Sequence, residues 1–424
     1  MKLTKYPPRS EWPALLQRPV QDPVQLREQV QQVLDAVRNG GDDALRSFTS
    51  QWDGVSLTDL AVSPTEWEEA IQFVEVELAS AIRLAAENIR RFHASQIQAE
   101  QVIQTAPGVQ CWRRSVGIER VGLYIPGGSA PLFSTVLMLG IPATLAGCSE
   151  IVLLTPPNRE GKVHPAILFA AREAGITAVY KAGGAQAIAA MAYGTETIPA
   201  VSKIFGPGNQ YVTCAKQLLQ MQGVAIDMPA GPSELCVLAD ESANAQWIAA
   251  DLLSQAEHGP DSQVLLVTDA ENILEQVKEA LLVQVERLPR STVAKAALEN
   301  SRLILVNDLK EAVDLVNEYA AEHLILACEN ASQLAHQVRN AGSVFLGHFS
   351  PESAGDYASG TNHTLPTNGF ARAYSGVSVD SFVRKITFQY LSEAGLAYIG
   401  PAVVTMAEAE GLQAHAEAVK IRLS

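Results

Sequence analysis

Short apolar runs that end in glycine or proline alternate with helix-like segments along most of the chain. After Arg120 the runs are VGLYIPGG, EIVLLTPP, AVYKAGG and KIFGPGN, and segments such as AQAIAAMAYG lie between them. A second stretch of the same kind begins near Leu235, with LCVLAD, SQVLLVTD and RLILVN as its apolar runs. Strands that alternate with helices indicate βαβ units and a parallel sheet. The sequence therefore predicts two α/β layers of similar size.

The segments outside these two layers have a different pattern. Up to about Gln110, charged and aliphatic residues recur at helical spacing, which predicts helices broken at Gly40 and Gly54. The stretch from Ser350 to Thr367 is rich in Ser, Gly, Asn and Pro and has no periodicity. A loop of that length is often functional. We expect the last part, from about Val377, to be mainly helical.

Length and charge limit what the protein can be. A chain of 424 residues exceeds what one core supports, so two or more folding units are expected. The net charge of −15, without a basic cluster, makes nucleic acid and anionic membranes poor partners. No apolar run reaches the length of a bilayer span, and the start, MKLTKYPPRSEWP, is polar. We expect a soluble cytoplasmic protein.

The five cysteines are odd in number and widely spaced, without a CxxC pair. Buried free thiols in a reducing compartment are the simplest interpretation, and a catalytic cysteine is the less favoured one.

Three glycine-rich turns follow apolar runs in the first α/β layer. They are PGG, AGGAQ and GPGN, with Tyr124, Gln186 and Asn209 beside them. Bare backbone amides at such turns hold phosphates in α/β proteins, although none of the three matches GxGxxG or GxxxxGK[ST]. Each turn alone is equally explained as a simple connection. Together they are consistent with a nucleotide site at the carboxyl ends of the strands.

A set of possible metal ligands is spread over the second half of the chain. In SQAEHG, Gln255 and His258 are three residues apart and share one helix face. The long loop adds Asp356 and His363, and the terminal helix adds His415, five residues after Glu410. Nitrogen and oxygen ligands of this kind suit zinc or a related divalent ion. Each residue also has a plainer interpretation, as a surface stripe, a turn cap or an exposed histidine.

Glu322 and His323 are adjacent in NEYAAEHL, which we interpret as the end of a helix. Neighbours on a helix point about 100° apart, so the two side chains can flank one bound molecule. A carboxylate beside an imidazole offers two bases for a reaction with two proton transfers. The alternative is a histidine that merely stabilises a helix C-terminus.

Taken together, these segments resemble the histidinol dehydrogenase family. The resemblance runs from about Val116 to the C-terminus and includes VGLYIPGGSAPLFSTVLMLGIPATLAG, AGGAQAIAAMAYGTETIP, KIFGPGNQYV, IDMPAGPSE, DLLSQAEHGPDSQ, NEYAAEHL, AGSVFLGHFSPESAGDYASGTNHTLPT, GLAYIGP and AEGLQAHAEAV. The departures are small. Ala321 stands where proline is expected, and Leu132 and Phe133 replace a more usual aromatic and proline pair.

The resemblance implies a particular domain arrangement. It implies two incomplete Rossmann-like domains with doubly wound parallel sheets, plus helical N-terminal and C-terminal extensions. Residues 1–21 would form the N-terminal extension. Residues 22–123 and 233–376 would form the domain with the metal and catalytic residues, and residues 124–232 the NAD-binding domain. Residues 377–424 would form a helical segment that reaches the partner subunit of a homodimer.

The resemblance also implies roles for individual residues. The implied ligands of one Zn²⁺ per subunit are Gln255, His258, Asp356 and His415. Further implied contacts to the substrate come from Ser233, His323, His363 and Glu410. The implied contacts to NAD, a cosubstrate, come from Tyr124, Gln186 and Asn209. Glu410 and His415 would complete the active site of the other subunit.

The implied reaction is the two-step oxidation of L-histidinol through L-histidinal to L-histidine, the last steps of histidine biosynthesis. His323 would act as the general base, and Glu322 would activate water for the aldehyde step. A dehydrogenase of another small diol or amino alcohol is the runner-up, which the retained His363 and Glu410 argue against. In a zinc hydrolase, which uses no nucleotide, the glycine-rich turns would have no function. A purely structural metal-binding protein would not need Glu322 and His323.

Overall fold

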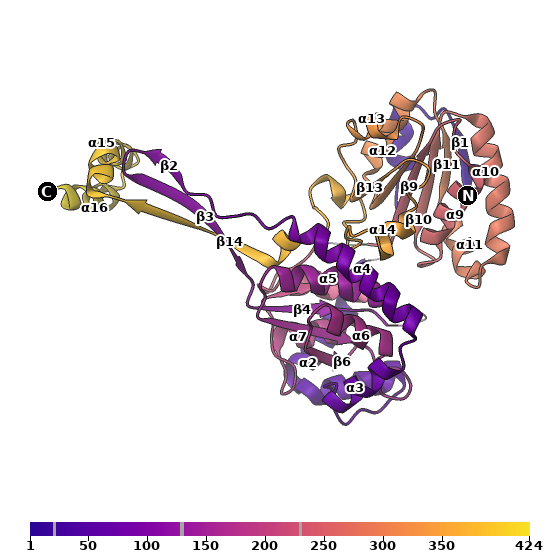
Figure 1. Cartoon of the computed structure of the whole chain (residues 1–424), viewed down its shortest axis with the longest axis horizontal. Helices are drawn as coiled ribbons and strands as arrows, with labels where there is room; N and C mark the ends of the chain where they lie inside the picture. The colour runs from indigo at the N-terminus through magenta and orange to yellow at the C-terminus, as the bar shows by residue number, and fades with distance from the viewer. Residues whose placement is uncertain (20–22, 128–130, 229–230) are drawn as a thin grey trace.

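The computed structural model describes residues 1–19, 23–127, 131–228 and 231–424. It contains two parallel β-sheets, each covered by helices on both faces, and a separate three-stranded antiparallel sheet (Figure 1). The two parallel sheets confirm the predicted α/β class. Within the described residues, no helix combines the length and the apolar character needed to cross a membrane.

The first sheet has six parallel strands in the order β1-β11-β10-β9-β12-β13. Its strands are β1 (Lys2–Lys5), β9 (Glu234–Ala239), β10 (Gln263–Thr268), β11 (Arg302–Leu305), β12 (His323–Ala327) and β13 (Ser343–Leu346). On the central strand β9, Leu235 and Val237 face one helical layer, whereas Cys236 and Leu238 face the other. Because successive side chains of a strand point to opposite faces, a continuous apolar run such as ELCVLA indicates burial on both.

Helices cover both faces of this first sheet. One layer consists of α9 (Ala245–Ala256), α10 (Glu271–Gln284) and α11 (Ser291–Glu299). The other contains α12 (Leu309–Tyr319), α13 (Ala331–Ala335) and the short α1 (Trp12–Leu15). The helix α14 (Glu352–Tyr357) lies beside α9, within the stretch that the sequence predicted to be a loop.

The N-terminal residues belong to this first sheet. We expected residues 1–21 to be a helical extension, but Lys2–Lys5 pair in parallel with Arg302–Leu305 as an edge strand. The strand is four residues long and reads KLTK, a short and charged pattern that is typical of a sheet edge. Such a pattern is easily mistaken for an extension outside the domains.

The second sheet has five parallel strands in the order β6-β5-β4-β7-β8. Its strands are β4 (Arg120–Tyr124), β5 (Glu150–Thr155), β6 (Ala178–Lys181), β7 (Lys203–Phe205) and β8 (Ala225–Ile226). The helices between them are α5 (Phe133–Leu145), α6 (Pro165–Glu173), α7 (Gly184–Tyr193) and α8 (Gln210–Gln220). Ile151 and Leu153 of β5 pack toward α5 and α6, and Val152 and Leu154 pack toward α7 and α8.

The N-terminal helices cover this second sheet, which corrects the expected grouping of residues 22–123 with residues 233–376. The helices are α2 (Pro23–Phe48), α3 (Pro64–Gln72) and α4 (Val76–Ala94). The helix α2 packs on α7 and α8, and α4 packs on α5. Leu34 of α2 and Ile89 of α4 are fully buried there. Each such side chain contributes about 1.5–3 kcal/mol of burial free energy, so the apolar stripes of these helices decide the grouping.

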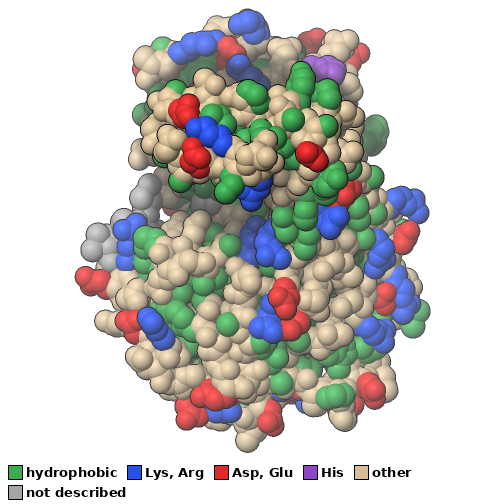
Figure 2. Space-filling view, turned by 90° about the vertical axis from the view of Figure 1, so that its left-hand side faces the viewer, with side chains coloured by type: hydrophobic (Ala, Val, Ile, Leu, Met, Phe, Trp, Pro, Cys, Tyr) green, Lys and Arg blue, Asp and Glu red, His purple; other side chains and the backbone are tan. Residues whose placement is uncertain are grey.

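A long arm projects away from the two α/β units (Figure 1). It is an antiparallel sheet of β2 (Ile103–Ala106), β3 (Val109–Gly117) and β14 (Val383–Leu391), with α15 (Glu393–Ala409) and α16 (Gln413–Leu423) at its tip. The C-terminal segment is mainly helical, as expected, but nine of its residues form the unpredicted strand β14, which pairs with β3 along its whole length. Figure 2 views the molecule from the side of the arm, where hydrophobic side chains lie exposed among charged ones.

Candidate active site

Two cavities adjoin each other, and the first of them lies between the two α/β units. The first, of about 600 Å³, is lined by residues of both units, among them Gln255, His258 and His363. The second, of about 1070 Å³, lies on the second unit and includes Tyr124 and Gln186 in its wall. Gly127 and Asn209 line both cavities, so the two spaces meet at these residues.

The two sheets present opposite edges to the first cavity. Pro126 and Gly127 of its wall follow β4, which ends at Tyr124, so the second sheet contributes its carboxyl edge, as in most α/β proteins. His323, in contrast, is the first residue of β12, and Gln255 lies at the end of α9, which returns to the starts of the strands. The first sheet therefore contributes its amino edge, where the C-termini of its helices gather.

Glu322 and His323 do not lie on a helix, contrary to our interpretation of the sequence. The helix α12 ends at Tyr319, and Ala320 takes a left-handed conformation with φ of 53°. This turn sends the chain directly into β12. Both side chains are buried in the wall of the first cavity, with Glu322 Oε2 3.7 Å from His323 Nδ1. The two side chains thus meet in one cavity at the start of a strand.

Burial and neighbouring charges shift the pKa of both groups. Burial raises the pKa of Glu322 to about 8, because the carboxylate loses its hydration. Burial alone would lower the pKa of His323, but the carboxylates of Glu322, Glu352 and Asp356 around the imidazole raise it. Two bases with perturbed proton affinities in one cavity are typical of an acid–base site.

Three of the four predicted metal ligands come together in this cavity. Gln255, His258 and Asp356 all line it. Gln255 Oε1 and Asp356 Oδ1 are buried and have no hydrogen-bond partner among the described residues. Burial lowers the pKa of His258, which favours the neutral imidazole that binds metals. Asp356 Oδ1 lies 3.4 Å from His323 Nε2, so its charged partner in the structure is the imidazole. Because buried polar atoms are nearly always satisfied by hydrogen bonds, the two oxygens fit a divalent cation.

Glu352 belongs to the same cluster, although the sequence analysis did not single it out. Ligand atoms of His323, Glu352 and Asp356 lie within 4.8 Å of one another. Glu352 and Asp356 are four residues apart on α14, so they share a helix face. The ESAGDY stretch has too few apolar residues for helical periodicity, and only the spacing of its two acids could have indicated this face.

The other predicted substrate residues differ in their placement. His363 lines the first cavity; its Nε2 lies 3.1 Å from Thr135 Oγ1, and its Nδ1 lies 2.8 Å from the carbonyl oxygen of Asp356. Ser233 directly follows Pro232 of the cavity wall. Glu410 and His415 lie at the tip of the arm, both exposed and outside the cavity walls. One chain therefore does not bring His415 to the other candidate ligands.

The three residues predicted to contact a nucleotide all line the second cavity. Tyr124 accepts a hydrogen bond at its hydroxyl from the backbone N–H of Gly184 at 3.0 Å, and burial raises its pKa to about 12. Gln186 Oε1 is buried without a partner among the described residues. Asn209 caps α8 through hydrogen bonds from the next helical N–H groups. The turn PGG ends at Gly128, which lies outside the described residues.

The buried acid–base pair, the candidate cation ligands and the larger cavity at a sheet edge define an α/β enzyme with room for a substrate and a nucleotide. The family model described as histidinol dehydrogenase matches residues 16–423. Histidinol dehydrogenase of Bacteroides fragilis is 59% identical over 423 residues, covering 100% of this chain and 99% of that protein. The Xylella fastidiosa enzyme is 54% identical over 410 residues, 96% of this chain and 95% of its own.

A solved structure agrees with these sequence matches. The crystal structure of histidinol dehydrogenase from Elizabethkingia anophelis is 56% identical and superposes with a TM-score of 0.97, covering 100% of this chain and 98% of that one. The chain belongs to the histidinol dehydrogenase family and is an NAD-dependent oxidoreductase. The resemblance inferred from the motifs is thereby confirmed.

Proposed function

We propose that this enzyme oxidises L-histidinol through L-histidinal to L-histidine, the last steps of histidine biosynthesis, and reduces two NAD molecules. The observation that carries the proposal is the pair of Glu322 and His323 in a cavity that adjoins a second, larger one. A substrate beside this pair would lie next to a nucleotide bound between Tyr124, Gln186 and Asn209. We expect the reaction to take place in the cytoplasm.

The first oxidation needs one base. L-histidinol binds in the first cavity with its hydroxyl group near His323 and in reach of His363. His323 takes the hydroxyl proton as the carbinol carbon gives its hydride to NAD, so that L-histidinal and NADH form. Retention of the aldehyde in the cavity protects it from reaction with amines in solution.

The second oxidation needs water and a second base. After a second NAD has replaced NADH, Glu322 takes a proton from a water molecule that attacks the aldehyde carbon. His323, protonated in the first oxidation, gives its proton to the former carbonyl oxygen, so that a gem-diol forms and the imidazole is neutral again. His323 then takes the proton of one diol hydroxyl as the second hydride leaves to NAD. The product is the carboxylate of L-histidine. The raised pKa of the Glu322 carboxyl makes it a stronger base than an exposed glutamate once it is ionised.

We assign one zinc ion per subunit to Gln255, His258, Asp356 and the partner subunit's His415. Gln255 Oε1 and Asp356 Oδ1, both buried without a hydrogen bond among the described residues, support this set within one chain. Bound zinc supplies a positive charge that orients the substrate's nitrogen atoms and favours the neutral form of nearby imidazoles. Ser233, His363 and the partner subunit's Glu410 complete the proposed contacts to the substrate.

The arm supports a homodimer in which each subunit completes the other's site. The helices α15 and α16 form its tip (Figure 1), with Glu410 at the end of α15 and His415 on α16. It also exposes several large apolar side chains, namely Tyr390, Tyr398, Met406, Leu412 and Ile421. Exposed apolar surface on a projecting element is typical of a subunit contact.

The experiment that tests the proposal counts NADH formed per L-histidinol consumed by the purified, zinc-loaded enzyme. We expect two NADH per substrate, with activity lost on treatment with a chelator and regained with zinc. One NADH per substrate would contradict the aldehyde step and the role of Glu322. No NADH would contradict the substrate and favour another small diol or amino alcohol.

A further inference from the structure

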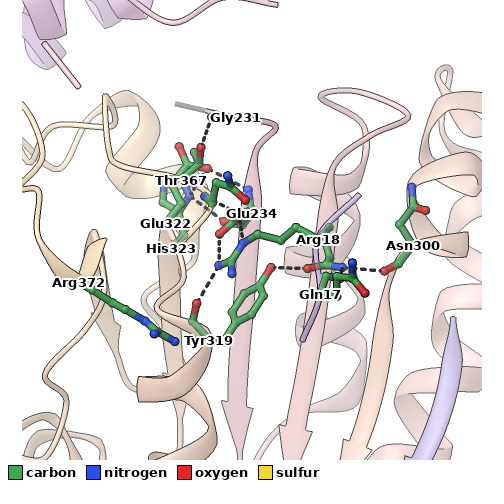
Figure 3. A network of polar contacts seen from close by, with 12 residues as sticks. Gln17, Arg18, Gly231, Glu234, Asn300, Tyr319, Glu322, His323, Thr367 and Arg372 are labelled. Atoms are coloured by element: carbon green, nitrogen blue, oxygen red, sulfur yellow. Dashed lines mark hydrogen bonds and ion pairs between the residues drawn. The ribbon is translucent and has the colours of Figure 1, made fainter. Parts of the chain in front are cut away.

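A buried ion pair behind the first cavity is not part of the proposed chemistry. Glu234, the first residue of β9, is 3% exposed at its side chain, and Arg18 is 16% exposed. Arg18 Nε and Arg18 Nη2 donate to the two carboxylate oxygens of Glu234 at 2.5 and 2.8 Å. A two-pronged contact of this kind fixes orientation as well as distance. Figure 3 shows Arg18 between Glu234 and Tyr319.

The backbone of Glu234 contacts three residues of the active site. Its N–H donates to Glu322 Oε2 at 2.9 Å. Its carbonyl oxygen accepts from Gln255 Nε2 at 3.2 Å and lies 3.3 Å from His323 Nδ1. One peptide segment therefore orients the water-activating acid, the imidazole base and a proposed zinc ligand. Gln255 Nε2 is held in this way, and Gln255 Oε1 is left unpaired among the described residues.

Arg18 also holds the chain on the other side of the catalytic pair. Its Nη2 donates to the carbonyl oxygen of Tyr319 at 2.7 Å, and its guanidinium lies over the Tyr319 ring at 4.2 Å. Tyr319 ends α12, directly before the left-handed turn at Ala320 that leads to Glu322. A third segment joins at Glu234, whose Oε1 accepts from the backbone N–H of Asn368 at 2.7 Å.

We propose that Arg18 and Glu234 are positioning residues for Glu322 and His323, through the peptide of Glu234 and the end of α12. Arg18 of the N-terminal segment thus acts on the catalytic pair through Glu234 and Tyr319, on the side away from the cavity, without contacting substrate. The Arg18 fork contacts both oxygens of the buried Glu234 carboxylate, whereas the Asn368 N–H contacts only Oε1, so we expect the fork to contribute most to the carboxylate's orientation. This inference rests on the proposed function, since it uses the separate roles of Glu322 and His323.

The test uses Arg18→Lys, which keeps the positive charge but loses the planar fork, and Glu234→Gln as a second variant. Rapid mixing of enzyme with L-histidinol measures the rate at which the first NADH forms. The same experiment with L-histidinal as the substrate measures the rate of the second oxidation. We expect both rates to fall, the aldehyde rate by about tenfold more, as for other outer residues that orient a site. The KM for NAD stays at the wild-type value, because the second cavity is built on the other sheet.

The ratio of the two rates separates positioning from a general loss of folded protein. Partial unfolding lowers both rates by the same factor and leaves the ratio unchanged. Arg372→Met is the matched control, because Arg372 Nη2 also contacts the end of α12, at the Glu318 carbonyl, but is half exposed and reaches neither Glu234 nor Glu322. We expect wild-type rates for this control.

Unchanged rates in Arg18→Lys and Glu234→Gln, or equal losses of both rates, would overturn the positioning role. Glu322→Gln is measured in parallel, so that a failure of the inference is distinguished from a failure of the proposed function. If Glu322→Gln itself slows both oxidations equally, the assigned role of Glu322 fails. If Glu322→Gln is selective for the aldehyde and the Arg18 and Glu234 variants are not, only the positioning role fails.

Discussion

Replacing Lys216 by methionine tests how the turn beside the nucleotide cavity is held. Lys216 of α8 pairs with Asp227, and the two side chains are 5% and 2% exposed. Lys216 Nζ donates to the carbonyl oxygen of Gly206 at 2.9 Å, and Asp227 Oδ2 accepts from the Gly206 N–H at 2.8 Å. The ion pair thus holds both polar backbone groups of Gly206, three residues before Asn209, which lines both cavities.

The structure gives the expected size of this effect. Methionine has nearly the length of lysine but no charge, so Lys216→Met leaves the buried carboxylate of Asp227 without its cation. Breaking a buried ion pair on one side costs about 3–5 kcal/mol. The double variant Lys216→Met, Asp227→Asn removes both charges and keeps an oxygen for the Gly206 N–H. We expect the double variant to regain most of the lost stability.

Urea unfolding at a fixed protein concentration, followed by circular dichroism, measures these differences, and an unchanged slope supports a common unfolding transition. Lys295→Met is the control, because Lys295 forms an exposed ion pair with Glu286. We expect this variant to have the unfolding midpoint of the wild type. We also expect Lys216→Met to raise the KM for NAD and not the KM for L-histidinol. A wild-type unfolding midpoint for Lys216→Met, or a double variant no more stable than the single one, would refute the reasoning.

Two further predictions concern the first cavity. We expect Glu322→Gln to slow oxidation of L-histidinal far more than that of L-histidinol, because only the aldehyde step needs an activated water; His323→Asn is expected to slow both, and rapid-mixing measurements of each step check this. We expect the variants His415→Ala and His323→Asn each to be inactive alone. When they are mixed, dissociated and reassociated, half of the dimers contain one subunit of each variant, and each of these mixed dimers has one intact shared site. The mixture is therefore expected to regain about a quarter of wild-type activity. Inactivity of the mixed dimers would contradict shared sites.

The sequence predicted the two parallel sheets because their strands are buried on both faces and read as continuous apolar runs. The helices before Gln110 were expected in the domain of the first sheet, whereas they cover the second. An apolar stripe with Leu34 or Ile89 on it shows that a helix packs, and either sheet of this chain could have received it. The strand β14 was missed for a related reason, since its partner β3 is more than 250 residues earlier and nothing local indicates the pairing.

Site residues were predicted where local spacing is informative and missed where it is not. The spacing of Gln255 and His258 suggested a shared helix face and a common ligand, although α9 ends at Ala256 and His258 lies in the turn beyond it. Glu234 gave no such signal, because a single acid at the start of an apolar strand looks like an ordinary strand boundary. Its importance arises from contacts with Arg18, 216 residues away along the chain. Pairings of that range come from the fold and not from local pattern.

The opposite edges that the two sheets present to the first cavity suit the charges proposed to bind there. The helices α9 and α12 of the first unit direct their C-termini toward it, next to Gln255 and Glu322. A helix C-terminus carries a partial negative charge, which favours a cation such as zinc. The helices α7 and α8 of the second unit begin at Gly184 and Gln210, in the walls of the cavities. Helix N-termini favour phosphate groups. The nucleotide would therefore bind near helix N-termini of the second unit, and the metal near helix C-termini of the first.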